Sequence, residues 1–189
     1  KLNMGLAFEK MGEVDSAMQY YGACSGVFVP DTYRIPALRR IGRLCQDAGM
    51  WEQSAAAYQK YLAIAESGEA RPEALSRLVN YYTHKESDAK KRTNLLETWV
   101  KEQPKQPLPL YLLASAVREK DPKRASSYFE EYILKYPRGE HREDAMYWSA
   151  WCSKVRAERS GDYSEYERKA DRYSDAYPQG QYVDLVEKR

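Results

Sequence analysis

Apolar and small residues recur at steps of three and four positions through most of this chain, and short interruptions at glycine or proline separate the series. One such series, which includes Leu38 and Cys45, stops at Gly49 and resumes at Ala55 and Tyr58. Steps of three and four place side chains on one face of an α-helix, and a glycine between two series allows a tight turn. This stretch therefore predicts two helices joined by a short turn.

The same design occurs 37 residues earlier in the chain. The matched pairs are Gly5 and Gly42, Gly12 and Gly49, and Tyr21 and Tyr58. A fixed spacing of this size is typical of helical repeat proteins, in which each unit buries its apolar faces against its neighbours. We expect two helices to approach closely at Gly42, so that Gly42→Leu overpacks the contact and costs about 1–3 kcal/mol.

A second repeated pattern lies in the other half of the chain. The motif Y-x-x-x-Y-P-x-G begins at Tyr132 and again at Tyr173, 41 residues later. The proline cannot continue a helix, and the glycine lets the chain reverse. The motif predicts the end of the second helix of a unit. At the start of the helix that precedes the first copy, Asp121 and Pro122 form a favourable N-cap and first position.

The apolar series divide the whole chain into helix pairs. We expect a single helical domain over residues 1–189. Because the sequence opens inside a helical pattern, we also expect it to be a fragment of a longer chain. Its units are expected at about 1–30, 34–67, 72–103, 107–137 and 140–178, with the start of a further helix at 180–189. The prediction is an all-α protein of about five antiparallel helix pairs.

These units resemble the tetratricopeptide repeat (TPR) family. The family positions are held in the second unit by Leu38, Ile41, Gly42, Cys45, Gly49, Ser54, Tyr58 and Tyr61, and in the first by Met4, Gly5, Phe8, Gly12, Ala17, Tyr21 and Cys24. In the fourth unit, the second helix matches through Ala125, Phe129, Tyr132 and Pro137. The resemblance implies a right-handed α-solenoid, the TPR-like superhelix, and a spacing above the usual ~34 residues implies longer helices or loops.

A further resemblance concerns the segment that follows the first Y-P-x-G copy. Tyr136 to Gly139, followed by Asp144 to Trp148, is similar to repeats of bacterial envelope proteins, namely outer-membrane assembly lipoproteins, the accessory protein of the Tol–Pal system and soluble lytic transglycosylases. This resemblance implies a bacterial protein of the periplasm or cell envelope.

Composition and motifs argue against several functional classes. The 30 Lys and Arg residues nearly balance 28 Asp and Glu residues, and this net charge of +2 is too small for a general nucleic-acid binder. The basic cluster at 89–94 lacks interleaved aromatic residues and is expected to be a solvated helix face. No apolar run approaches the roughly 18 residues of a membrane span.

The sequence also lacks a recognisable catalytic constellation. His84 and His141 are 57 residues apart, and no phosphate-binding glycine motif is present. We expect no catalytic residues, no cofactor and no metal site. The odd number of cysteines favours buried thiols, and whether Cys24 and Cys45 pair is left open.

In the family that the chain resembles, the first helices of successive units line a concave groove. Their non-core positions define the predicted partner-binding residues: Arg39, Arg43, Gln46, Asn80, His84, Leu110, Arg118 and Arg156. These residues form a mildly basic, polar surface, which favours an acidic protein or peptide partner held by guanidinium groups. The alternative for each position is simple solvation.

The leading hypothesis is a non-enzymatic scaffold for protein–protein interaction, because a solenoid offers a large surface and no reactive constellation is evident. Two alternatives stay open. The chain could be the helical, non-catalytic part of a larger enzyme such as a soluble lytic transglycosylase, or it could be a structural element that assembles with copies of itself into a homo-oligomer.

Overall fold

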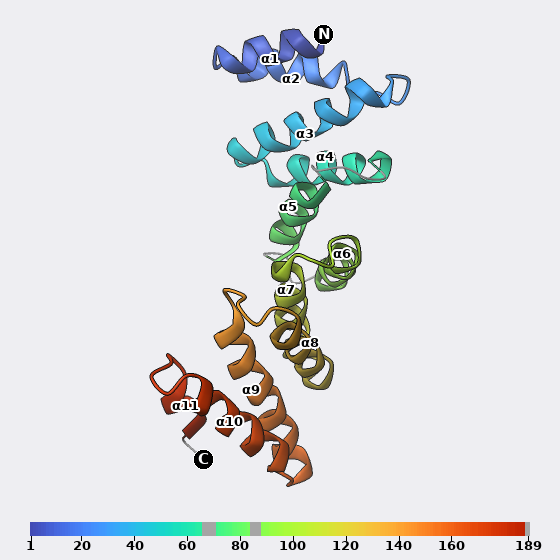
Figure 1. Ribbon diagram of the computed structural model, residues 1–189. Helices are drawn as coiled ribbons and strands as arrows, with labels where there is room; N and C mark the ends of the chain where they lie inside the picture. The colour runs from blue at the N-terminus through green and yellow to red at the C-terminus, as the bar shows by residue number, and fades with distance from the viewer. Residues whose placement is uncertain (66–70, 84–87, 188–189) are drawn as a thin grey trace. The chain divides into compact units, whose positions relative to one another are not determined.

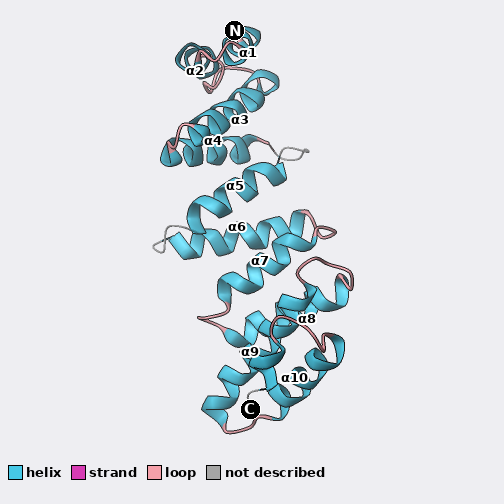
Figure 2. Ribbon diagram, turned by 90° about the vertical axis from the view of Figure 1, so that its left-hand side faces the viewer, coloured by secondary structure: helices cyan, strands magenta, loops and turns pink. Residues whose placement is uncertain are grey.

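The computed structural model of this chain describes residues 1–65, 71–83 and 88–187 (Figure 1). Over these ranges the regular structure is helical and contains no strand (Figure 2). This confirms the all-α fold built from antiparallel helix pairs. The chain forms two compact units, Lys1–Asp88 and Ala89–Arg189, where the sequence predicts one domain. The exact limits of the repeat units stay a prediction.

Unit 1 contains two helix pairs and the first helix of the next. Its helices are α1 (Leu2–Lys10), α2 (Val14–Gly22), α3 (Asp31–Asp47), α4 (Trp51–Ile64) and α5 (Arg71–Thr83). Each helix packs against the next one along the chain, which is the arrangement that a repeat solenoid requires.

The 37-residue repeat in unit 1 has a direct structural cause. A Cβ atom on Gly42 would lie 2.8 Å from ring atoms of Tyr58, and a Cβ on Gly5 would lie 2.6 Å from the ring of Tyr21. Both tyrosines are buried, so in each pair the ring of the second helix lies directly on the backbone of the first. The close approach predicted at Gly42 is confirmed.

The turns between the paired helices follow from the other repeated glycine. Gly12 and Gly49 have φ values of +78° and +72°, which other residues rarely adopt. Each ends a first helix in the left-handed conformation, so the predicted tight turn is present in both copies.

Unit 2 contains α6 (Ala89–Glu102), α7 (Pro107–Val117), α8 (Pro122–Lys135), α9 (Arg142–Ser160), α10 (Ser164–Ala176) and α11 (Val183–Glu187). Successive helices again pack on one another. The Asp121 side chain accepts a hydrogen bond from the Arg124 N–H at 3.0 Å, and Pro122 is the first residue of α8. The predicted N-cap is therefore present.

The Y-x-x-x-Y-P-x-G motif ends α8 and α10, as its proline and glycine predict. The structure adds a second role for its first tyrosine. The hydroxyl of Tyr132 accepts a hydrogen bond from the His141 N–H at 3.3 Å, and that of Tyr173 accepts one from the Tyr182 N–H at 3.0 Å. The motif therefore fixes the path of the chain into the next helix.

The second residue after each motif also joins two units of the repeat. The ring of His141 stacks on Tyr111 of α7 with centroids 4.3 Å apart, and the ring of Tyr182 stacks on Tyr147 of α9 at 4.1 Å. Asp144 lies beside both stacks, because it accepts hydrogen bonds from the hydroxyls of Tyr111 at 3.3 Å and Tyr182 at 2.8 Å. Consecutive helix pairs in unit 2 are thus linked by aromatic and polar contacts.

Candidate functional site

The predicted partner-binding residues of unit 1 lie on α3 and α5. Arg39 forms an ion pair with Glu73 at 2.5 Å, and Arg43 approaches the same carboxylate at 3.9 Å. Gln46 accepts a hydrogen bond from Arg77 at 2.7 Å. The sequence prediction missed Glu73 and Arg77, although they complete this cluster.

The other two residues predicted for this surface are Asn80 and His84. Asn80 of α5 is exposed, as expected for a residue that meets a partner. His84 lies outside the described residues. We call the surface formed by Arg39, Arg43, Gln46, Glu73, Arg77 and Asn80 the α3–α5 face.

In unit 2 the predicted partner-binding residues are buried or contact other side chains of this chain. Leu110 is 2% exposed and belongs to the core, so its placement in the groove is corrected: α7 turns this apolar side chain inward. The Arg118 guanidinium lies 3.6 Å from the ring centroid of Trp148, a cation–π contact. Arg156 forms an ion pair with Glu165 at 3.1 Å.

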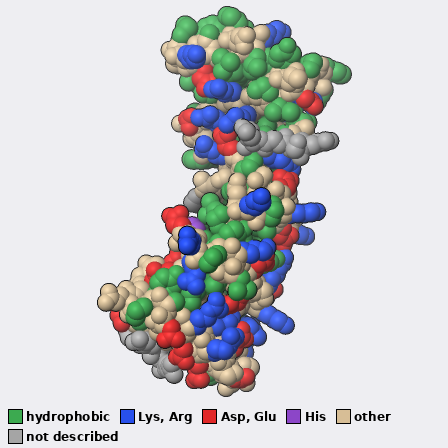
Figure 3. Space-filling view, in the orientation of Figure 1, with side chains coloured by type: hydrophobic (Ala, Val, Ile, Leu, Met, Phe, Trp, Pro, Cys, Tyr) green, Lys and Arg blue, Asp and Glu red, His purple; other side chains and the backbone are tan. Residues whose placement is uncertain are grey.

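The α3–α5 face has an excess of positive charge. Among the described residues, the charged groups that act on the Tyr58 hydroxyl are Arg39, Arg43 and Arg77 and one carboxylate, that of Glu73, which gives a local charge of +2. Figure 3 shows Lys and Arg side chains gathered over the α3–α4 part of unit 1, with Asp and Glu side chains beside them. Arg39 and Arg43 keep 42% and 47% of their side chains exposed, so both guanidinium groups remain accessible to a partner.

The repeat brings together the same three positions twice in unit 1. In the first triad, formed by Glu9, Tyr21 and Arg40, the Tyr21 hydroxyl donates to Glu9 Oε2 at 2.5 Å and Arg40 Nη1 donates to Oε1 at 2.8 Å. The second triad consists of the residues 37 positions later, Gln46, Tyr58 and Arg77. The 37-residue spacing was the signal that could have found Arg77, because Arg77 corresponds to Arg40.

The second triad differs from the first because glutamine replaces glutamate. The side-chain oxygen of Gln46 accepts a hydrogen bond from Arg77, but the buried hydroxyl of Tyr58 has no hydrogen-bond partner among the described residues. Burial raises the pKa of Tyr58 to about 12, although the positive charges of Arg77, Arg43 and Arg39 act to lower it. The hydroxyl therefore stays protonated at neutral pH and is an unused donor.

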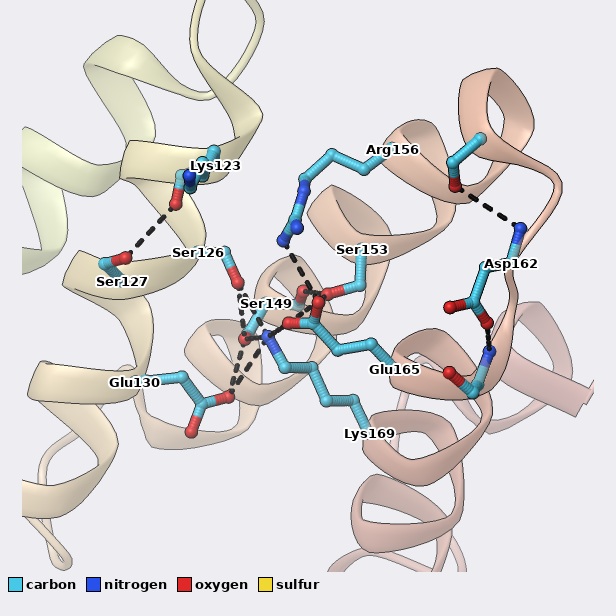
Figure 4. A network of polar contacts seen from close by, with 12 residues as sticks. Lys123, Ser126, Ser127, Glu130, Ser149, Ser153, Arg156, Asp162, Glu165 and Lys169 are labelled. Atoms are coloured by element: carbon cyan, nitrogen blue, oxygen red, sulfur yellow. Dashed lines mark hydrogen bonds and ion pairs between the residues drawn. The ribbon is translucent and has the colours of Figure 1, made fainter.

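Unit 2 holds a different polar cluster, centred on Lys169 of α10 (Figure 4). Its side chain is 5% exposed, and its ammonium group donates to Ser126 Oγ at 2.6 Å and to Ser149 Oγ at 3.0 Å. Glu165 and Glu130 lie 3.0 Å and 3.7 Å from the same nitrogen. We call these five residues the Lys169 cluster; it borders an open hollow of about 600 Å³ between α8 and α10.

The Lys169 cluster contains a serine and a lysine at the distance of a nucleophile and its base. Its electrostatics oppose that chemistry. The Lys169 nitrogen is paired with the carboxylates of Glu165 at 3.0 Å and Glu130 at 3.7 Å as well as with the serines, so it is held in an ion-pair network. The cluster is therefore best explained as a polar junction that joins α8, α9 and α10.

The carboxyl groups of this cluster have altered pKa values. Burial acts to raise the pKa of Glu130, but hydrogen bonds from Ser149 and Arg172 and the charge of Lys169 outweigh it, so the pKa lies below its usual value. For Glu165, burial likewise opposes Lys169 and Arg156, and the pKa is again lowered. Both groups are ionised at neutral pH.

The structure also answers the questions about cysteine pairing, metal ligands and membrane-spanning helices. Cys24, Cys45 and Cys152 are buried free thiols, so Cys24 and Cys45 are not paired. In the part of the chain that the structure describes, no cluster of three or more side chains could ligate a metal ion. None of the helices within these same ranges combines the length and apolarity needed to cross a bilayer.

The fold is that of tetratricopeptide repeat proteins. Among solved structures, the TPR protein YrrB, described as having an unusual peptide-binding site, superposes with a TM-score of 0.66 at 14% identity, covering 100% of this chain and 90% of that one. MamA superposes with a TM-score of 0.63 at 14% identity, covering 95% and 93% of the two chains. A TPR protein from Parabacteroides merdae gives a TM-score of 0.65 at 17% identity, covering 98% and 68%.

These similarities are structural. No family model matches the sequence, and no curated protein is significantly similar to it. The α-solenoid fold predicted from the repeats is confirmed, because the similarity extends over nearly the whole chain in each of the three structures.

Proposed function

We propose that this protein is a non-enzymatic scaffold that binds an acidic segment of a partner protein on the α3–α5 face. The observation that carries the proposal is the imbalance of charge on this face, where Arg39 and Arg43 share the carboxylate of Glu73 and Arg77 pairs with the neutral side chain of Gln46. Arginine pairs with carboxylates through two parallel hydrogen bonds, so it suits recognition of Asp and Glu side chains. A fold similar to that of a peptide-binding TPR protein supports the proposal.

The polar groups of unit 2 contribute less to this proposal. Arg118 and Arg156 each have a partner of their own, Trp148 and Glu165, whereas Arg39 and Arg43 share one carboxylate; the charges of the Lys169 cluster also pair with one another. A partner that used these groups would first have to displace contacts within the protein. The α3–α5 face therefore carries the proposed binding, and an envelope location stays a prediction.

The test compares two double variants in a crosslinking pull-down from the native host. Arg39→Glu with Arg43→Glu reverses both exposed charges of the face and should abolish capture of the partner. The matched control, Lys10→Glu with Lys60→Glu, makes the same change of charge at exposed positions of α1 and α4 and should capture it normally. Equal capture by both double variants would contradict the proposal.

The same pair of variants also guards against a loss of folding. Exposed ion pairs contribute only about 0–1 kcal/mol, and like charges on an exposed helix surface oppose one another by similar amounts, so the double reversal beside Glu73 should change the melting temperature little. Circular dichroism melting of both double variants measures this directly. A large fall in melting temperature for the arginine variant alone would mean that capture was lost through unfolding.

A further inference from the structure

The first triad shows what its three positions are built to hold. One carboxylate, that of Glu9, accepts hydrogen bonds from the Tyr21 hydroxyl and from Arg40 at the same time, one with each oxygen. A single acidic group thereby satisfies a buried hydroxyl and neutralises a guanidinium group. Because a buried polar group without a partner destabilises the fold, this arrangement is favourable for α1, α2 and α3 together.

The second triad repeats the hydroxyl and the guanidinium but not the acid. Gln46 can present one carbonyl oxygen, and that oxygen accepts from Arg77. Tyr58 is 1% exposed and its hydroxyl is left without a partner. The charges of Arg39 and Arg43 act on the same hydroxyl, so the site carries both an unused donor and unbalanced positive charge.

We propose that the second triad binds a carboxylate of the acidic partner segment, at the position that corresponds to the Glu9 carboxylate in the first triad. One oxygen of the incoming carboxylate accepts a hydrogen bond from the Tyr58 hydroxyl, and the other oxygen pairs with the Arg77 guanidinium group. The side chain of Gln46 is half-buried and moves aside. This inference rests on the proposed function, since it names the subsite on the same face.

The surroundings favour a single carboxylate over a doubly charged group such as phosphate. Glu73 already lies beside Arg39 and Arg43, and its charge opposes a second negative charge at short range. The first triad also matches the two oxygens of a carboxylate, one for each donor. We expect the neighbouring acidic residues of the segment to contact Arg43, the more exposed of the two arginines.

The test supplies the missing acid within the chain. Gln46→Glu should raise the melting temperature, because the new carboxylate pairs with Tyr58 and Arg77. It should also weaken binding of a fluorescein-labelled hexaglutamate peptide, measured by fluorescence anisotropy, by about tenfold or more, because its subsite is filled. Asn80→Glu adds the same charge elsewhere on the face and should do neither to a comparable extent.

Two further variants separate the subsite from general electrostatics. Tyr58→Phe removes the unused donor, and it should weaken hexaglutamate binding severalfold without a change of charge. Glu9→Gln creates the same vacancy in the first triad, so it should lower the melting temperature while hexaglutamate still binds at least as tightly as to the wild type.

The outcomes distinguish the inference from the proposed function. If Gln46→Glu and Tyr58→Phe bind hexaglutamate as the wild type does, while Arg39→Glu with Arg43→Glu does not, the acid is held elsewhere on the face and the inference is wrong. An absence of hexaglutamate binding to the wild type would also overturn it. The crosslinking pull-down described above then tests the proposed function independently of this inference.

Discussion

Gly42 lies on α3 directly against the ring of Tyr58, and this contact predicts the effect of a small substitution. In Gly42→Ala, the new Cβ would be 2.8 Å from the ring, and overpacking of this kind costs about 1–3 kcal/mol. Replacing a helical glycine by alanine gains only about 1 kcal/mol, so the variant should be less stable. Urea unfolding measures the difference.

Gly22, at the end of α2, provides the control for this prediction. A Cβ there would meet no atom within 4 Å. Gly22→Ala should therefore be neutral or stabilising by up to about 0.5–1 kcal/mol. If Gly42→Ala were as stable as Gly22→Ala, the close approach of Tyr58 would not exist in solution.

Lys169 is the buried charge whose removal should have the largest effect in unit 2. Lys169→Ala removes the shared ammonium group, but Glu130 keeps Arg172 at 2.8 Å and Glu165 keeps Arg156 at 3.1 Å, and both carboxylates are partly exposed, so the expected loss is about 1–3 kcal/mol. The triple variant Lys169→Met, Glu130→Gln, Glu165→Gln removes all three charges and should recover much of this loss. Thermal unfolding that fails to separate the two variants would contradict the role of the cluster.

At the scale of the element, the two copies of the Y-x-x-x-Y-P-x-G motif should differ in strength. Tyr173 donates to Glu143 at 2.8 Å and accepts from the Tyr182 N–H at 3.0 Å, whereas the hydroxyl of Tyr132 accepts from the His141 N–H at the longer distance of 3.3 Å. Tyr173→Phe should cost about 1–3 kcal/mol, since the Tyr182 N–H loses its acceptor and Glu143, which keeps the Gln181 N–H, loses one of its two donors; Tyr132→Phe should cost about 1 kcal/mol.

Hydrogen exchange offers a local measurement of the same difference. The amide of Tyr182 should exchange faster in Tyr173→Phe, because its acceptor is lost. The corresponding variant Tyr132→Phe serves as the control and should leave that amide unchanged. Equal losses of stability in the two variants would show that the Glu143 contact does not strengthen the second copy.

At the scale of the whole molecule, acid should weaken unit 2 through the Lys169 cluster. The pKa values of Glu130 and Glu165 are lower in the folded protein than the usual value of 4.5. Their stabilisation is present above the unfolded pKa and is lost as pH falls through the folded values. Protection of α8, α9 and α10 amides should decrease below about pH 4.5.

The double variant Glu130→Gln with Glu165→Gln is the control for this pH dependence. This variant should be less stable at neutral pH, and the protection of the same amides should depend less on pH in the acid range. An unchanged pH dependence would mean that other carboxyl groups control the acid response of this unit.

The repeats in the sequence predicted the helix pairs well, because the signals are local. Apolar residues at helical spacing, a glycine at each tight turn and a proline after each second helix determine structure within a few residues. The spacing of 37 residues even located the close approach of two helices at Gly42, where the structure places the ring of Tyr58. The prediction for Leu110 was wrong because periodicity does not say which of several apolar faces a helix buries.

By itself, the sequence determined the class of fold, the paired helices and the turns that join them, since these depend on neighbours in the chain. Only the tertiary structure decided which polar groups meet. Tyr21 reaches Glu9 across 12 residues and Lys169 reaches Ser126 across 43, and such contacts depend on how helices pack. For the same physical reason, the unpaired hydroxyl of Tyr58 became visible only in three dimensions, although the glutamine that leaves it unpaired was in the sequence throughout.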